Sequence, residues 1–482
     1  MQFNSYLFIQ LLPAFIILYF LLNKINQHLG KLLIILAGMA FYAYGGIESF
    51  LVLCISVIYN FGISLWISKI KKGKKALLAF SITVNILILL YYKYSNFALT
   101  TINDLLGKEF NIKKLVLPLG ISFFTFQQIM YVVTVFREEV KSINVFDYLA
   151  YVLYFPKLVM GPLIEPNDFI TQLNDRGKKK INWDNLVSGT KLFSFGLFKK
   201  MLLADTFAKG VGWGFANLEA ATAGDLYLVM LFYTFEIYFD FSGYSDMAVG
   251  VSKMINITLP MNFDSPYKAL SIRDFWKRWH ISLTNFLTRY VYFPLGGSKR
   301  GIVRTYVNIM IIFLISGLWH GANWTFILWG SIYGILMVME RVFKKHLEKK
   351  ENSGAKWLGT FIIVNILWLL FRSETIAQWG ELLSKMFSFQ NMEISEGLIQ
   401  AFILPESSFL IEGLGLENLN QTIRGLSMLT FVIASFIICL IPENNYRNSD
   451  KNGIINMVLC AVAFVWAFLC LSSESVFVYF NF

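Results

Sequence analysis

The chain has 482 residues, of which 56% are hydrophobic and only 15% are charged. Soluble domains usually carry about a quarter charged residues, so this composition excludes a largely water-facing surface, and we expect a lipid bilayer as the solvent. The net charge of +11 does not indicate a nucleic-acid-binding protein. Lysine and arginine gather instead in short clusters between apolar runs, as in the cytoplasmic loops of membrane proteins. The clusters are 69–75, 176–180, 299–304 and 341–350.

The apolar runs predict an all-α, polytopic membrane protein with about 11 transmembrane helices, since a bilayer core about 30 Å thick needs roughly 20 apolar residues per span. The first run is expected to be retained rather than cleaved, because further spans follow it at once. The basic loops place 23–31 and 69–75 in the cytoplasm and both termini outside it. The candidate spans lie near 5–22, 32–46, 49–68, 76–93, 114–136, 186–208, 223–252, 305–319, 324–342, 357–371, 426–442 and 454–471.

Two regions do not fit simple spans. Residues 145–170 contain Pro156, Pro162 and Pro166 in an apolar stretch. Proline breaks helices, and lipid offers no replacement partner for the backbone, so this stretch is expected to be re-entrant. Residues 372–425 are more polar and are expected to form an extracytoplasmic excursion with short amphipathic helices. No repeat or linker divides the chain, which predicts one membrane-embedded domain over 1–482.

The four cysteines indicate no chemistry. They lie in apolar runs without a close pair, which is typical of small hydrophobic residues in helices rather than of disulfides or a zinc site. We expect no metal and no tightly bound cofactor. Of the four histidines, His28 and His346 lie among polar residues in presumed cytoplasmic loops and are not assigned a role.

His280 lies in SIRDFWKRWHISLTNFLTRY, residues 271–290. At 100° per residue, aromatic side chains that include Trp279 share one face of this segment, and Lys277 and Arg278 share the other. The pattern predicts one strongly amphipathic helix in the membrane interface. His280 would lie at the border of the two faces, either as a functional group or as an interfacial anchor.

His320 follows an apolar run that begins after Arg304. The sixteen intervening residue steps extend about 24 Å as a helix, which is less than the bilayer core, so His320 is expected at membrane depth. Ionisable groups at that depth are costly and usually face a cavity or a functional pathway. The alternative is a buried histidine bonded to a neighbouring carbonyl.

Glu236, Asp240 and Asp246 are carboxylates in an apolar background, in FEIYFDFSGYSDMAVG. Gly243 is a candidate break in their helix. Buried carboxylates need partners, and the candidates are three cations: Lys253, Lys277 and Arg278. Either a structural ion pair or the orientation of a histidine would explain them.

Three ordered blocks resemble the core of the membrane-bound O-acyltransferase family: DFSGYSDMAVG, DFWKRWHISLTNFLTRYVYFPLGG and SGLWHGANWTFILWG. The resemblance covers about 115–345 well and the N-terminal segments loosely, whereas 350–482 matches mainly in hydropathy. FPLGGSKRG and YFPKLVMGPL are similar to the branch that contains the membrane component of alginate O-acetyltransferase and its relatives acting on peptidoglycan and cellulose.

The resemblance implies a helical bundle around a central tunnel, an essential histidine at His320 and a second, more variable one at His280. A neutral imidazole near pH 7 is a suitable base for transfer from an activated thioester such as acetyl-CoA, and a transient acyl-histidine is also possible. Asn323 or backbone N–H groups are candidates to hold the thioester oxygen. The further candidates for lining the substrate tunnel are Trp319, Asn323, Asp240, Ser242, Asp246, Trp279, Lys277 and Arg278.

The resemblance therefore predicts a bacterial cytoplasmic-membrane enzyme that passes acetyl groups from cytoplasmic acetyl-CoA to an extracytoplasmic polysaccharide. The chain shows no soluble domain with a Ser/His/Asp set, so we expect an extracytoplasmic serine-type acetyltransferase or esterase as partner. Three alternatives stay open: D-alanyl transfer from a carrier protein to teichoic acid, transport of polysaccharide or lipid without chemistry, and acylation of a protein.

Overall fold

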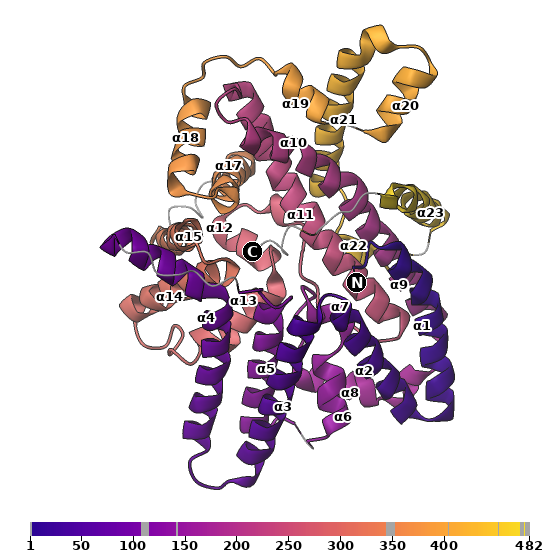
Figure 1. Cartoon of the computed structure of the whole chain (residues 1–482), viewed down its shortest axis with the longest axis vertical. Helices are drawn as coiled ribbons and strands as arrows, with labels where there is room; N and C mark the ends of the chain where they lie inside the picture. Colours follow the sequence, from indigo (N-terminus) through magenta and orange to yellow (C-terminus); the bar gives the residue numbers. More distant parts are fainter. Residues whose placement is uncertain are drawn as a thin grey trace. The chain divides into compact units, whose positions relative to one another are not determined.

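The computed structural model describes residues 2–107, 115–140, 143–343, 352–402, 404–451, 453–472 and 477, and every regular element within them is a helix (Figure 1). His346, one of the two histidines without an assigned role, lies outside the described residues. The chain divides into two compact units: residues 1–194, 244–261 and 449–460 form the first, and 195–243, 262–448 and 461–482 form the second.

The first unit consists of the N-terminal helices (Figure 1). They are α1 (Tyr6–Ile25), α2 (Gln27–Ala43), α3 (Ile47–Lys69), α4 (Lys74–Leu106), α5 (Ile121–Phe136), α6 (Val145–Val152), α7 (Phe155–Leu158), α8 (Pro166–Asn174), η1 (Arg176–Lys179) and most of α9 (Trp183–Phe198). Asn60 and Asn85 join α3 to α4, because each side-chain amide donates to the other, at 3.0 and 2.8 Å. The buried pair of Lys31 and Asp147, with 2.5 Å between Nζ and Oδ1, joins α2 to α6.

The second unit contains the helices that carry most of the predicted site. They are η2 (Lys199–Ala204), α10 (Asp205–Ala216), the first part of α11 (Ala223–Met254), η3 (Pro266–Lys268), α12 (Ile272–Arg278), α13 (Ile281–Leu287), η4 (Thr288–Tyr292), α14 (Ile302–His320), α15 (Trp324–Val342), α17 (Ser353–Arg372), α18 (Ile376–Phe387), α19 (Glu396–Ala401), α20 (Pro405–Gly413), η5 (Glu417–Leu419), α21 (Asn420–Leu440) and α22 (Asn445–Asn448). The last helices are α23 (Ile454–Leu469), which both units share, and η6 (Cys470–Ser472).

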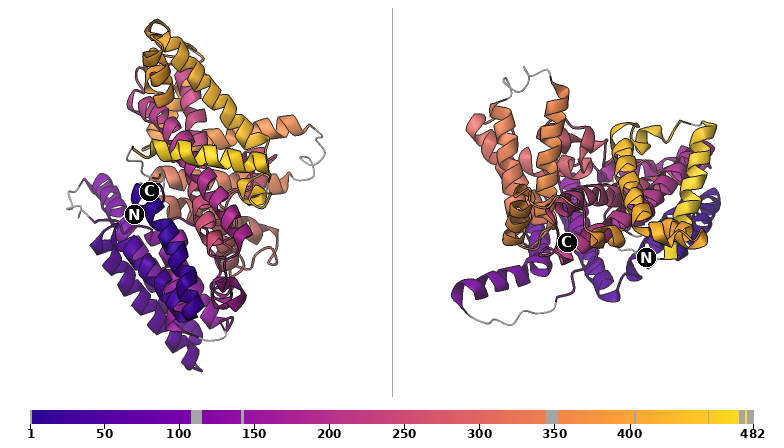
Figure 2. Two further views of the ribbon diagram at one scale, coloured as in Figure 1. Left: turned by 90° about the vertical axis from the view of Figure 1, so that its right-hand side faces the viewer. Right: turned by 90° about the horizontal axis from the view of Figure 1, so that it is seen from above.

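Helices α14 and α15 follow each other in the chain and pack against each other as a hairpin. Figure 2 shows the salmon to orange helices of this part of the chain from two further sides. Glycines allow their backbones to meet. A Cβ on Gly317 would lie 2.3 Å from the carbonyl oxygen of Phe326, and a Cβ on Gly330 would lie 2.3 Å from that of Phe313. Larger residues would separate the two helices, so this close packing fixes the position of His320 at the end of α14.

Seven described helices are long and apolar enough to cross a membrane: α1, α3, α4, α14, α15, α17 and the helical stretch Glu417–Leu440 that contains α21. Three shorter apolar helices are α2, α5 and α23. The prediction of a helical, multi-pass membrane protein is confirmed, while the count of about 11 spans stays a prediction. As predicted, 145–170 is broken into short pieces, α6 to α8, and 372–425 contains short helices, α18 to α20.

Two local predictions were wrong. A third, the span over 186–208, stays a prediction: the backbone there is helical throughout, and it passes through the π-helix η2 between α9 and α10. Gly243 does not break its helix, since α11 continues to Met254; close packing explains this glycine, because a Cβ there would lie 2.8 Å from the Gly196 carbonyl oxygen. The single helix expected over 271–290 is divided into α12 and α13.

Candidate active site

His320 is the last residue of α14 and is only 4% exposed. Three aromatic rings surround its imidazole in edge-to-face contact, with centroid distances of 4.8 Å to Trp319, 5.3 Å to Trp329 and 5.1 Å to Phe371. The rings come from α14, α15 and α17, the three apolar helices that follow one another in the chain. The predicted reactive histidine is therefore buried in an aromatic shell at the end of an apolar helix.

His280 occupies the break between α12 and α13. Its φ of +46° is in the left-handed region, which costs a residue other than glycine about 1–2 kcal/mol. The turn is fixed by Asn262, whose backbone carbonyl accepts from Ile281 at 3.0 Å and whose side chain accepts from the Ser282 N–H at 3.2 Å. The imidazole is 1% exposed, and burial lowers the pKa of His280 to about 3.

The break corrects the predicted border position of His280. Helix α12 ends at Arg278, and Trp279 then turns inward, where it is 1% exposed with its ring centroid 4.8 Å from that of Trp368. His280 therefore lies in the protein interior rather than between a polar and an apolar face. Burial of both side chains in an aromatic core offsets the cost of the left-handed residue.

Trp319 connects the two histidines. Its indole centroid lies 5.9 Å from the His280 ring and 4.8 Å from the His320 ring. Phe241 of α11 contacts the other side of His280 at 4.8 Å. The structure thus brings three of the predicted site residues together, from segments about 40 positions apart; their catalytic roles stay predictions.

The acidic candidates have a different partner from the ones expected. Asp240 pairs with Lys200 of the π-helix η2 at 2.7 Å, and the same ammonium lies 2.9 Å from Asp205. The side chains of Lys200 and Asp240 are both 1% exposed. The prediction of Lys253, Lys277 or Arg278 as the partner of Asp240 was wrong. Ser242 and Asp246 are both buried.

Two basic candidates differ in their surroundings. Arg278 is engaged within its own segment, because its guanidinium donates to Asp274 at 2.9 Å and to the Asp264 carbonyl at 3.2 Å. Lys277 is exposed. Lys253 belongs to the first unit and pairs with Asp450 at 2.5 Å.

Asn323 has a structural role in this conformation. Its side-chain oxygen caps α15 by accepting from the Thr325 N–H at 3.0 Å, and its amide nitrogen donates to the Glu374 carbonyl at 2.7 Å. The amide nitrogen carries a second N–H, so the predicted contact with a thioester oxygen would not require either bond to break.

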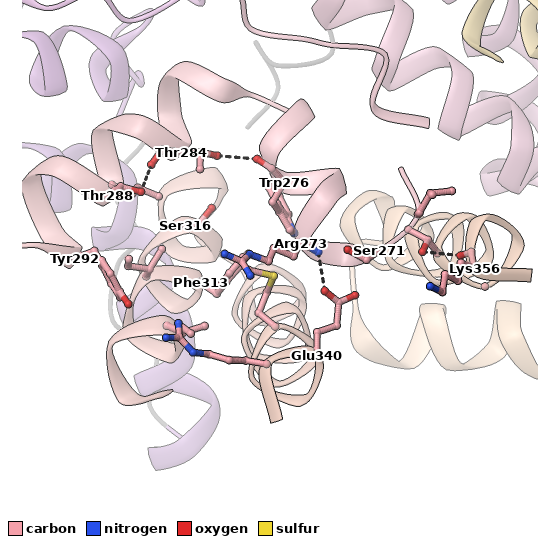
Figure 3. A pocket seen from close by; sticks show the side chains of 18 of the residues that line it. Ser271, Arg273, Trp276, Thr284, Thr288, Tyr292, Phe313, Ser316, Glu340 and Lys356 are labelled. Carbon is pink, nitrogen blue, oxygen red and sulfur yellow. Dashed lines mark hydrogen bonds between the residues drawn. The ribbon is translucent and has the colours of Figure 1, made fainter. Parts of the chain in front are cut away.

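A cavity of about 1060 Å³ lies beside this aromatic core, between α12, α13, η4, α14, α15 and α17 (Figure 3). Helix α14 contributes Ile309, Ile312, Phe313 and Ser316 to its wall. The spacing of these residues places them on one helical face, and His320 continues that face four residues beyond Ser316, about 6 Å farther along the axis. The cavity therefore leads toward His320, which is not itself in its lining.

The charged part of the cavity wall is mainly cationic. Arg273, Arg341 and Lys356 line it together with one acid, Glu340 (Figure 3). Glu340 caps α12, because its carboxylate accepts from the backbone N–H groups of Ile272 at 2.6 Å and of residue 273 at 2.9 Å. The remaining positive charge suits an anionic ligand. Sequence reasoning missed this wall, since its residues come from distant segments.

The comparisons with known proteins agree with this architecture. A sequence profile of MBOAT, the membrane-bound O-acyltransferase family, matches residues 36–376. The peptidoglycan O-acetyltransferase of Helicobacter pylori is 34% identical over 526 aligned positions, which cover 100% of this chain and 97% of the relative. A probable alginate O-acetylase AlgI of Pseudomonas aeruginosa is 36% identical over 405 positions, covering 82% and 76%. The teichoic acid D-alanyltransferase of Streptococcus thermophilus is 28% identical over 282 positions, covering 52% and 67%.

The family match extends over most of the chain, and the two O-acetylating relatives exceed 30% identity with most of both chains aligned. It includes both buried histidines and the indole between them. Together with the seven apolar helices, it shows that this chain is a multi-pass membrane O-acyltransferase belonging to the membrane-bound O-acyltransferase family.

Proposed function

We propose that the chain takes an acetyl group from cytoplasmic acetyl-CoA and passes it across the membrane for O-acetylation of an extracytoplasmic polysaccharide. The observation that carries the proposal is the cationic cavity whose α14 wall ends at Ser316, about one helical turn before the buried His320. His320 acts either as the general base or as a transient acyl acceptor.

The cavity chemistry supports a coenzyme A thioester as donor. Its phosphates are anionic, and guanidinium groups such as those of Arg273 and Arg341 bind phosphate through paired hydrogen bonds. A donor held at these cations directs its acyl end along the α14 face toward His320. No redox chemistry is required, because the thioester is already activated.

The relatives support the class of acceptor, and the partner protein is part of the proposal. The relatives with the largest coverage are named for peptidoglycan and alginate O-acetylation, which supports a cell-envelope polysaccharide as acceptor. The proposal places the protein in the bacterial cytoplasmic membrane with both termini outside the cytoplasm. An extracytoplasmic serine-type acetyltransferase or esterase would complete the transfer to the polymer.

The test is turnover of radiolabelled acetyl-CoA by purified protein in nanodiscs, with and without such a partner. Wild type is compared with His320→Ala and His280→Ala. His28→Ala is the matched control, because that histidine is exposed at the start of α2. We expect turnover that is lost in His320→Ala and retained in His28→Ala.

Two other outcomes would redirect the proposal. Transfer from an acylated carrier protein, but not from acetyl-CoA, would place the chain with the D-alanyltransferases, a family branch that it matches over about half of its length. Equal turnover by wild type and His320→Ala would remove His320 from the reaction.

A further inference from the structure

Three buried polar atoms beside His320 have no hydrogen-bond partner among the described residues: the indole nitrogens of Trp276 and Trp329 and the hydroxyl of Tyr333. These side chains are 7%, 0% and 0% exposed. Their rings contact one another, with centroid distances of 5.6 Å between the indoles and of 5.0 and 4.9 Å from Tyr333 to Trp276 and Trp329. We call these three side chains the indole–phenol cluster.

Such a cluster is unusual in a protein interior. Buried tryptophan and tyrosine side chains normally place their N–H or O–H on an acceptor, because an unsatisfied buried donor loses its bond to water without replacement. An apolar side chain would avoid this loss. Three side chains in mutual contact, each with an unsatisfied donor, therefore indicate a site for a group that brings its own acceptor atom.

The cluster lies between the cavity and the candidate catalytic histidine. Trp276 is part of the cavity wall, near Phe313 and Ser316 (Figure 3). Trp329 is in edge-to-face contact with His320 at 5.3 Å. An acceptor atom bound by the cluster would thus lie at the end of the cavity and beside the imidazole. Asn323, the donor expected from the sequence, caps α15 with its oxygen and uses one of its two amide hydrogens for the Glu374 carbonyl.

We infer that the indole–phenol cluster binds the carbonyl oxygen of the acyl thioester and stabilises the negative charge that develops on it during transfer. The inference rests on the proposed function. Preorganised donors aimed at a developing oxyanion, in a site that excludes water, are commonly the largest contribution to acyl transfer. The cluster supplies up to three such donors without a charged group.

In the acyl transfer step, the acceptor hydroxyl oxygen bonds to the thioester carbonyl carbon while His320 takes the hydroxyl proton. The carbonyl π electrons move to the oxygen held by the cluster. The oxyanion then reforms the C=O bond and the C–S bond breaks with its electron pair on sulfur. The thiolate takes the proton from His320. The products are the ester and the free thiol of coenzyme A.

The test removes donors while it keeps aromatic rings, in the full chain in nanodiscs with acetyl-CoA. Tyr333→Phe deletes only a hydroxyl, and Trp329→Phe deletes the N–H of the cluster ring that contacts His320. The matched controls are Tyr227→Phe and Trp379→Phe, whose deleted donors bind the carbonyls of Met386 at 3.2 Å and of Ile366 at 3.2 Å. Steady-state kinetics and thermal unfolding are measured for each.

We expect kcat to fall about 100-fold in Trp329→Phe and at least several-fold in Tyr333→Phe, with little change in KM. The unfolding temperature of Tyr333→Phe should be equal to or higher than that of wild type, because an unsatisfied group is removed. The control variants should show the opposite pattern, with wild-type kcat and a lower unfolding temperature.

Wild-type kcat in both cluster variants would overturn the inference. A lower unfolding temperature in Tyr333→Phe with normal kcat would also overturn it, because the hydroxyl would then have a structural partner such as water. If wild type itself does not turn over acetyl-CoA, the proposed function fails and the inference fails with it. Turnover that requires His320 but neither cluster donor would refute this inference and leave the proposed function intact.

Discussion

Lys200 is expected to be the most sensitive charged residue of the second unit. Its ammonium lies 2.7 Å from Asp240 and 2.9 Å from Asp205, and the three side chains are 1%, 1% and 19% exposed. Lys200→Met would remove the ammonium that these two carboxylates share. Removal of one partner from a buried ion pair costs about 3–5 kcal/mol, so we expect a loss of that size in the free energy of unfolding.

Substitution of the acidic partner, Asp240, should reduce the free energy of unfolding by less. Asp240→Asn leaves Lys200 paired with Asp205, and the new amide can still accept a hydrogen bond, so we expect a loss of roughly 1–3 kcal/mol. The double variant Lys200→Met with Asp240→Leu should be more stable than Lys200→Met alone. Unfolding in a fixed detergent, followed by tryptophan fluorescence against denaturant, measures all three.

Lys253→Met is the control for this series. It removes a lysine from an ion pair of 2.5 Å whose carboxylate, on Asp450, is 72% exposed, and such pairs contribute at most about 1 kcal/mol. The reasoning is refuted if Asp240→Asn destabilises the protein more than Lys200→Met does, or if Lys253→Met costs as much as Lys200→Met. Either result would mean that burial does not determine the energy of these pairs.

Three further predictions concern the site. Burial lowers the pKa of His280 to about 3 from 6.5, so the contribution of the neutral imidazole to stability is complete above pH 6.5 and is lost as the pH falls toward 3. Between pH 4 and 7 this residue should make the free energy of unfolding rise with pH, by up to roughly 1.4 kcal/mol per pH unit. The rise should be smaller in His280→Gln and unchanged in His28→Gln. A Cβ on Gly321 would lie 2.0 Å from the ring of Phe326, so Gly321→Ala should destabilise the protein by about 1–3 kcal/mol and reduce acetyl-CoA turnover; wild-type stability and kcat would contradict this. Arg273→Gln should raise the KM for acetyl-CoA severalfold with a small effect on kcat, whereas Arg273→Lys, which keeps the charge, should raise the KM less. Equal KM values for wild type and both variants would show that the cationic wall of the cavity does not bind the donor.

Much of the fold could be predicted because lipid restricts the chain. A spanning segment must be helical and apolar, so the apolar runs located α14 and the helices around it, and the three prolines located the broken stretch 145–170. His320 could be recognised as well, since an ionisable residue at the end of an apolar run has few structural uses.

The remaining features depend on contacts between distant residues. Lys200 and Asp240 are 40 positions apart, and two lysines in an apolar run give no signal of which carboxylate they meet. The break at His280 was missed because the buried residues on its two sides, Trp276 and Leu283, have the seven-residue spacing of a continuous helix. The indole–phenol cluster was missed because aromatic residues at helical spacing normally indicate only a core.

The paired amides of Asn60 and Asn85 have a consequence for how the protein enters the bilayer. A helix that crosses alone would carry into hydrocarbon an amide with bonds only inside its own helix, from Asn60 to Ser56 or from Asn85 to Ser81. Helices α3 and α4 add the bonds between the two amides if they cross together as a hairpin. The short basic turn between them stays in the cytoplasm in this scheme. The two segments would then insert into the membrane together as one helical hairpin. The bonds between the two amides would fix the rotation of α3 relative to α4 before the later helices are synthesised.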